Sequence, residues 1–419
     1  MCSILCTRAH NWTLHEDRKV AEMDQVKAQL ANHLDALCNQ IGERHLGSDG
    51  EKKAADYIQR CFEDAGHPVV REDFDAPGWK YGAYSLEVVE TGESLPCFPC
   101  FYSNACDLTD RLTVIDPRDF QGLDLKGKIC FAPQKSAARG EGVEDRNELA
   151  ERLDERGAAA LIVVGRHPDT VDTKAVRSPN LKRLAVMDVA GNTVWDIARN
   201  IHHRFRMKIE AETFPTTSTN VIARVTGSRP EKIVIGAHYD TAPGIVGGGD
   251  NATGVALTLE LARVLKGKTQ GYSVDFIGFS GEEYGGKGSA LGSFEYVNRH
   301  IDEIGNIAWM GTFDDVGNPF GQENVYIGRS WRLRGQVDEL VRPHGFKTGD
   351  VVLGSDNCSF HHHAIPTLYF GNSSPYKQIH SPEDNLKVVS IDALHRVFEV
   401  VLEVFTNLLA TPPDRYKVS

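Results

Sequence analysis

GAHYDTAPGIVGGGDNATG, residues 236–254, is the stretch from which the fold of this chain is inferred. The mostly apolar run 232–235 precedes it and is typical of a strand buried on both faces. Polar groups then follow at His238 and Asp240, and Asp250 comes after a glycine-rich turn. Helix-forming sequence comes next. A buried strand, a polar loop and a helix in this order are how open α/β sheets present ligands at the carboxyl ends of their strands.

Strand-like and helix-like segments alternate from Asn220 onward. The predicted strands are 221–225, 232–237, 274–279, 307–313 and 367–370. The last helix is expected to begin at Ser390, because apolar residues recur after it at helical spacing. The pattern predicts a three-layer α/β/α sandwich with a mostly parallel central sheet.

The rest of the chain divides into two further parts. Residues 1–83 contain two predicted helices and a strand, and we assign them to the main domain together with residues 217–419. Residues 84–216, hereafter the insert, alternate short strands and helices without a convergent set of His, Asp and Glu. We therefore predict a smaller inserted α/β domain, with the polar run 215–219 as the linker out of it.

Composition excludes some classes of function. The 419 residues carry a net charge of −12, which argues against a broad nucleic-acid surface. No apolar run approaches the length of a membrane span, and the N-terminus lacks the pattern of a secretory signal. Cys97 and Cys100 form a lone CxxC, which is interpreted as ordinary free thiols. A cytoplasmic location is expected, or an extracytoplasmic one if the start residue is misassigned.

Carboxylates and imidazoles gather where predicted strands end. They are His238 and Asp240, the pair Glu282-Glu283, the pair Asp314-Asp315, and later His380, with Asp250 on its own loop. His and Asp are common zinc ligands, and three carboxylates with a hydroxide would balance the charge of two zinc ions. The residues 361–363 are three consecutive histidines, which rarely all face one ion, so we do not assign them to the site.

Five separated motifs carry a family resemblance. In chain order they are HYD (238–240), GGGDNATG (247–254), GFSGEE (278–283), FDDVGN (313–318) and HSPEDN (380–385). Together they resemble the co-catalytic dizinc exopeptidases of metallopeptidase family 28, the aminopeptidase and glutamate-carboxypeptidase-like group. In the insert, DLKGKI (124–129) and ERGAAALIVV (155–164) resemble the protease-associated domain that some members of this family carry.

The resemblance implies a role for each site residue. It implies that His238 and Asp314 bind one zinc, that Glu283 and His380 bind the other, and that Asp250 bridges the two. It also implies that Glu282 is the general base, that Asp240 orients His238, and that the Asp250–Asn251 peptide bond is cis.

Three positions depart from the family's pattern. Asp315 follows Asp314 where an apolar residue is frequent, so Asp315 stays an alternative ligand. Residues 355–357 read Ser-Asp-Asn where some members have Ser-Asp-His. Ile379 stands where some members have an oxyanion-binding tyrosine, and Tyr376 is three residues earlier.

The expected function is that of a zinc-dependent exopeptidase with a peptide substrate, and an aminopeptidase in particular. In the expected mechanism a metal-bridging hydroxide attacks the terminal peptide carbonyl while Glu282 moves the proton. A carboxypeptidase or dipeptidase is an alternative, with Arg329, Arg332 and Arg334 as candidate partners of a substrate carboxylate. An amide deacylase, a glutaminyl cyclase and a non-enzymatic binding module are further alternatives on the same fold.

Overall fold

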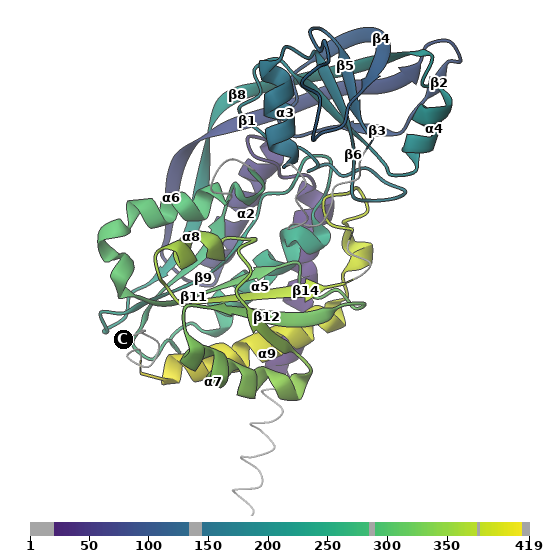
Figure 1. Cartoon of the computed structure of the whole chain (residues 1–419). Coiled ribbons are helices and arrows are strands. Elements are labelled where there is room, and N and C mark those ends of the chain that lie inside the picture. The colour runs from purple at the N-terminus through teal and green to yellow at the C-terminus, as the bar shows by residue number, and fades with distance from the viewer. Residues whose placement is uncertain (1–20, 134–144, 285–289, 375–377, 413–419) are drawn as a thin grey trace, which may run out of the picture.

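A large mixed sheet forms the centre of the protein (Figure 1). This computed structural model describes residues 21–133, 145–284, 290–374 and 378–412. In order across the main domain, the strands are β13 (Lys347–Asp350), β12 (Gln322–Gly328), β14 (Thr367–Ser373), β11 (Ile307–Asp314), β9 (Lys232–His238), β10 (Ser273–Phe279), β8 (Arg204–Val225) and β1 (Val69–Val88). The four central strands β14, β11, β9 and β10 are parallel to one another.

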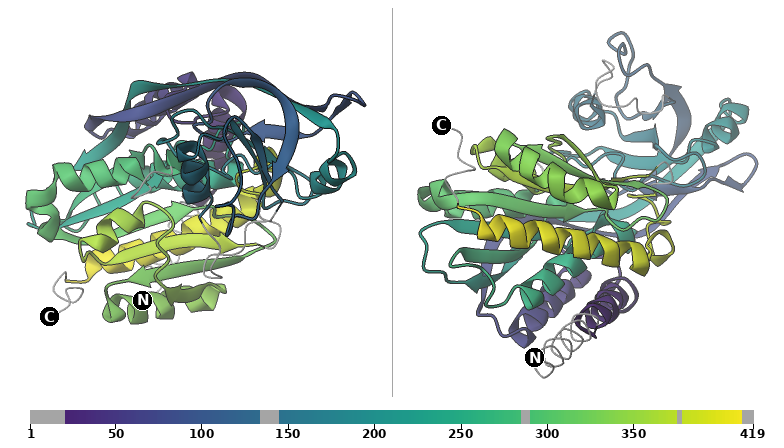
Figure 2. Two further views of the ribbon diagram at one scale, coloured as in Figure 1. Left: turned by 45° about the horizontal axis from the view of Figure 1, so that its top comes forward. Right: turned by 90° about the horizontal axis from the view of Figure 1, so that it is seen from below.

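Helices cover both faces of this sheet, as the views in Figure 2 show. One face carries helical residues 21–34, η1 (Asp35–Ile41), α2 (Asp49–Asp64), α5 (Thr253–Val264), α7 (Trp331–Val341) and α9 (Ile391–Ala410). The other face carries α6 (Leu291–Arg299) and α8 (Asn357–His362). The predicted three-layer α/β/α sandwich with a mostly parallel central sheet is therefore confirmed.

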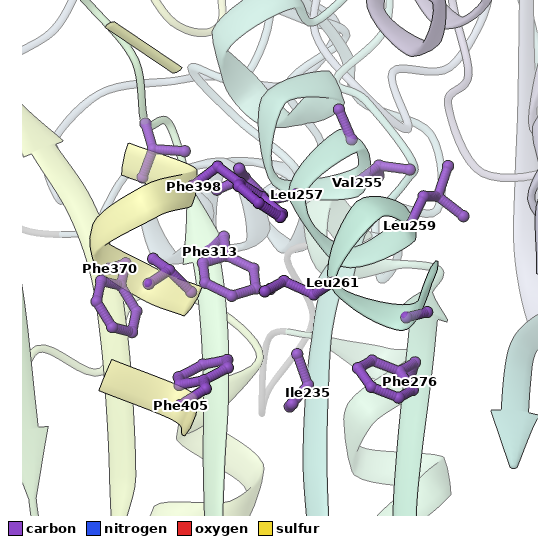
Figure 3. Close-up of a cluster of buried hydrophobic side chains, with 14 of the residues drawn as sticks. Ile235, Val255, Leu257, Leu259, Leu261, Phe276, Phe313, Phe370, Phe398 and Phe405 are labelled. Atoms are coloured by element: carbon purple, nitrogen blue, oxygen red, sulfur yellow. The ribbon is translucent and has the colours of Figure 1, made fainter. Parts of the chain in front are cut away.

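The alternation of side chains along β9 explains why both faces need helices. Ile233 and Ile235 join the hydrophobic cluster under α5 and α9, whereas Val234 joins the cluster under α6 and α8. Figure 3 shows Ile235 with Phe276 of β10 on one side, Phe405 of α9 on the other and Leu261 of α5 above it. Burying a side chain of this size stabilises the fold by roughly 1.5–3 kcal/mol. Exposure of either face would therefore be costly.

The insert has strands, helices and hydrophobic clusters of its own. Its elements are β2 (Glu93–Ser94), β3 (Cys97–Pro99), β4 (Cys106–Val114), β5 (Ile129–Ala132), α3 (Arg146–Glu155), β6 (Ala160–Val164), β7 (Ala185–Val189) and α4 (Thr193–Arg199). Strands β4, β5, β6 and β7 lie side by side and parallel. The domain boundaries and the likeness to a protease-associated domain stay predictions.

A long antiparallel ribbon joins the insert to the main domain. Strands β1 and β8 pair from Val69 opposite Ala223 to Val88 opposite Phe205. The prediction of a linker at 215–219 is wrong, because β8 runs through these residues. Their threonines favour extended backbone, and the opposite strand satisfies their main-chain hydrogen bonds.

Short helical segments complete the chain, and several elements lacked a clear sequence signal. The short segments are η2 (Gly248–Ala252), η3 (Glu282–Tyr284), η4 (Ile301–Asn306), η5 (Arg342–His344) and η6 (Leu386–Val388). The sequence did not predict β12, β13, α6, α7 or α8. Across the described parts of the chain, no helix is both long and apolar enough to cross a membrane.

Candidate metal centre

The first part of the site lies at the carboxyl ends of two neighbouring strands. His238 ends β9 and Asp314 ends β11, and both are buried. The His238 Nε2 atom is 3.6 Å from Asp314 Oδ1 and 3.2 Å from Asp250 Oδ1. These three residues place their ligand atoms close enough to hold one metal ion. We call His238 and Asp314 the first half-site.

The second part comes from loops. Glu283 lies in η3 after β10, and His380 lies in the loop after β14 with a left-handed backbone (φ 61°). The His380 Nε2 atom is 2.9 Å from Asp250 Oδ2 and 3.4 Å from Glu283 Oε1. We call Glu283 and His380 the second half-site. Asp250 is shared, because its two carboxylate oxygens face different imidazoles.

The donor set suits a pair of divalent cations. His238 Nε2, Asp250 Oδ1 and Glu283 Oε1 are buried without a hydrogen bond, whereas Glu283 Oε2 forms an ion pair with Lys174. Buried polar atoms normally have such a partner, so atoms left without one and directed at a common point are typical of metal ligands. Histidine and carboxylate together are ligands that zinc prefers.

Burial and charged neighbours shift the pKa values of the candidate ligands around Asp250 in different directions. Burial alone would raise the pKa of Asp250, but the imidazoles of His238 and His380 hold it well below its usual range. Burial and the charge of Lys174 lower the pKa of His380 to about 4, so this imidazole is neutral near pH 7. These are the protonation states in which a carboxylate and an imidazole bind metal. For His238, burial would lower the pKa, but the carboxylates of Asp240, Asp250 and Asp314 raise it well above its usual value.

Asp240 organises the residues around it. Its main-chain carbonyl is 3.1 Å from His238 Nδ1, and a carboxylate oxygen is 3.5 Å from the same nitrogen. The two carboxylate oxygens accept hydrogen bonds from the backbone amides of Glu282 and Glu283, at 3.1 and 3.0 Å. A single buried residue thus holds both the His238 imidazole and the turn that carries the predicted base.

The glycine-rich loop is pinned to the sheet beside the site. The Asp250–Asn251 peptide bond is cis. The Asn251 side chain donates to the Phe313 carbonyl at 2.8 Å and accepts from the Gly254 amide at 3.0 Å. These bonds hold the start of α5 against the end of β11, which brings Asp250 between the two imidazoles.

Two residues that sequence reasoning missed hold this loop from the other side. Asp384 accepts from the amides of Gly249 and Asp250 at 2.7 and 3.1 Å. Asp384 lies in the HSPEDN motif, so this acidic residue could have been noticed in the sequence. Arg44 is fully buried and donates to five main-chain carbonyls, including those of Val246 and Gly247. Nothing in the sequence around Arg44 marks it, because three of its five partners, Tyr239, Val246 and Gly247, lie 195 to 203 residues further along the chain.

The remaining candidates lie outside the two groups of ligand atoms. Asp315 and residues 361–363 belong to neither group. Tyr376 lies outside the described residues. Asp356 is fully buried at the start of α8, and burial raises its pKa well above the usual range of a carboxyl.

The three candidate arginines are far from the metal-ligand groups. The strand β12 ends at Gly328, opposite Thr367 at the beginning of β14, and α7 follows it. Arg329 donates to the His361 carbonyl, and Arg334 pairs with Asp350. Since the site lies where β11 and β14 end, these arginines are at the opposite edge of the sheet.

Two cations of the insert do reach the site. Lys174 Nζ forms an ion pair with Glu283 and is 3.5 Å from Glu282 Oε2. Arg177 Nη1 is 3.7 Å from Glu283 Oε2. Burial raises the pKa of Glu282, but Lys174 and His238 outweigh it and lower the pKa below the usual value. Glu282 is therefore ionised near pH 7, as a general base must be.

The chain is similar in sequence and in fold to known aminopeptidases. The aminopeptidase YwaD of Bacillus subtilis (strain 168) is 25% identical over 405 residues, which cover 88% of this chain and 82% of that protein. The solved aminopeptidase from Aneurinibacillus sp. strain AM-1 is 26% identical, covers 90% of this chain and 92% of its own, and has a TM-score of 0.70.

A second solved structure has the same fold. BSAP, a zinc aminopeptidase from Bacillus subtilis, gives a TM-score of 0.76 at 22% identity, over 94% of this chain and 98% of its own. Residues 220–405 match the profile of the family described as Peptidase family M28, and they include every residue of both half-sites. The chain therefore carries a peptidase family M28 domain, as the five motifs predict.

Proposed function

We propose that this protein is a zinc-dependent exopeptidase, and specifically an aminopeptidase that hydrolyses the first peptide bond of a peptide. The observation that carries the proposal is the position of Asp250, whose two carboxylate oxygens face His238 on one side and His380 on the other. The aminopeptidase names of the relatives support the direction of cleavage.

The two half-sites would hold two zinc ions, with Asp250 between them. Bound zinc would supply a water of lowered pKa and polarise the peptide carbonyl. Asp240 keeps His238 in place, while Asp384 and Arg44 keep the Asp250 loop in place. We assign the proton transfer to Glu282, which is buried and ionised beside the second half-site. It would take a proton from water and deliver it to the leaving amine.

The test is cleavage of two matched dipeptide panels by the zinc-loaded protein. One panel is blocked at the amine and the other at the carboxylate, and each is run with and without a chelator. We expect chelator-sensitive cleavage of the carboxylate-blocked peptides and none of the amine-blocked peptides. Cleavage only of the amine-blocked panel would make the protein a carboxypeptidase. No cleavage of either panel by protein with two bound zinc ions would favour an amide deacylase or a cyclase.

A carboxypeptidase is not favoured by the described residues. The arginines that the sequence suggested for a substrate carboxylate lie at the opposite edge of the sheet from the half-sites.

A further inference from the structure

The insert contacts the loop that carries His380. The Thr173 backbone amide donates to the His380 carbonyl at 2.8 Å, and the Thr173 hydroxyl donates to the same carbonyl at 3.2 Å. His167 Nε2 is 3.1 Å from the carbonyl of Ile379, the residue before it. Two consecutive carbonyls of the metal-binding loop are therefore held by side chains or backbone of the insert.

Thr173 is itself held firmly. Its neighbour Asp172 donates its backbone amide to Asp188 Oδ2 in β7 at 2.7 Å. Arg166 Nε donates to the Asp172 side chain at 2.7 Å. Thr173 and Asp188 are fully buried. The turn that contacts the His380 loop is thus hydrogen-bonded to strand β7 of the insert.

Lys174, the residue after Thr173, places a positive charge beside the second half-site. The Lys174 side chain is 8% exposed, and its ammonium group lies against Glu283, the carboxylate of the second half-site. Arg177 adds a second positive charge near the same carboxylate. A metal cation at Glu283 would lie beside this positive charge, which also acts at longer range on Asp250 and Asp314, although Lys174 has no ion pair with His238 or Asp314 among the described contacts.

We propose that this segment of the insert sets the metal affinity of the second half-site. Thr173 is a positioning residue that favours binding by holding His380, and Lys174 is an internal cation that opposes binding at Glu283. The inference rests on the proposed dizinc function. It implies that the two half-sites fill at different zinc concentrations, the first half-site before the second.

The two residues make opposite predictions, which a zinc titration against a competing chelator would test. Thr173→Val removes the hydroxyl and keeps the amide, and it should weaken the second zinc roughly tenfold, as loss of an outer contact to a ligand does. Lys174→Met keeps the length of the side chain and removes its charge. It should tighten the second zinc by about tenfold or more. In both variants the affinity for the first zinc should change less than the affinity for the second.

Two controls separate these effects from general damage to the insert. Thr173→Ser keeps the hydroxyl and should restore the wild-type affinity of the second zinc. Lys182→Met removes the charge of an exposed lysine of the insert and should have no effect. The melting temperature of each zinc-free variant, measured in parallel, should match that of the wild type.

The outcomes distinguish this inference from the proposed function. Two bound zinc ions with the same second affinity in all variants would overturn the inference alone, as would weaker binding by Lys174→Met. A wild-type protein that never binds a second zinc would instead overturn the dizinc function on which the inference rests.

Discussion

The two halves of the candidate metal centre are built from different kinds of structure. His238 and Asp314 are the last residues of two parallel strands that are hydrogen-bonded within the central sheet. Glu283 lies in a single helical turn, and His380 lies in a loop that the insert holds by its carbonyls. The comparison teaches that one half-site has both of its residues on strands of the sheet, whereas the other depends on a contact between residues 207 positions apart.

The largest effect is expected for Glu282, the assigned general base beside the second half-site. Glu282→Gln should lower kcat by roughly 10²–10⁴-fold, the usual contribution of a general base, because the amide cannot accept a proton. Both zinc ions should stay bound, since Glu282 is in neither group of ligand atoms. Steady-state kinetics and elemental analysis would check this. A variant with near-normal kcat would remove Glu282 from its assigned role.

The next prediction concerns the residue that joins the halves. Asp250→Ala should lose at least one of the two zinc ions, because each half-site loses a carboxylate oxygen. His238→Ala and His380→Ala are the matched comparisons, and each should lose the ion of its own half-site only. Zinc content per chain after dialysis measures all three. Two zinc ions retained by Asp250→Ala would show that it does not bridge.

Arg44 offers a test of the scaffold behind both halves. Arg44→Met should lower the free energy of unfolding by about 3–5 kcal/mol, because main-chain carbonyls lose their buried partner. Urea unfolding of the zinc-free protein measures this change. Arg60→Met, at an exposed position of α2, is the control and should change little. Equal stability of the two variants would show that the Arg44 contacts contribute no net stability.

The smallest effect is expected for Asp384, which holds the backbone of the shared residue Asp250. Asp384→Ala removes the acceptor of the Gly249 and Asp250 amides, and should weaken zinc binding roughly tenfold. Both half-sites should be affected alike, unlike the selective effect expected for the insert. Glu383→Ala, at the exposed neighbour, is the control in the same chelator titration. An unchanged affinity in Asp384→Ala would limit its role to the local fold.

The same contrast explains what could be predicted from the sequence. The strands that carry His238 and Asp314 are continuous apolar runs, so their periodicity and the polar residues after them were visible. The structure places all five predicted ligands in the two groups of ligand atoms, while their roles as zinc ligands stay predictions.

Other features depend on distant partners and left no local signal. Arg44 and Thr173 are recognisable only through the carbonyls they contact, which lie elsewhere in the chain. The linker prediction at 215–219 failed for a related reason, because those residues are ordered by the opposite strand of a ribbon. Interactions of this kind depend on the completed fold, and a local reading of composition or periodicity does not contain them.

The ribbon also determines how the insert can be cut out. Asp75 lies opposite Thr217 on the ribbon that leads to the insert, so a cut across the ribbon at this pair removes the insert together with residues 76–83 of the main domain. A two-residue Asn-Gly turn between Asp75 and Thr217 would close the ribbon as an ordinary hairpin. The shortened protein would retain all five ligands and Glu282, and it would lose the segment that grips His380. Removing the insert in this way would therefore show whether the metal centre forms without the contacts that Thr173 and Lys174 make with its second half-site.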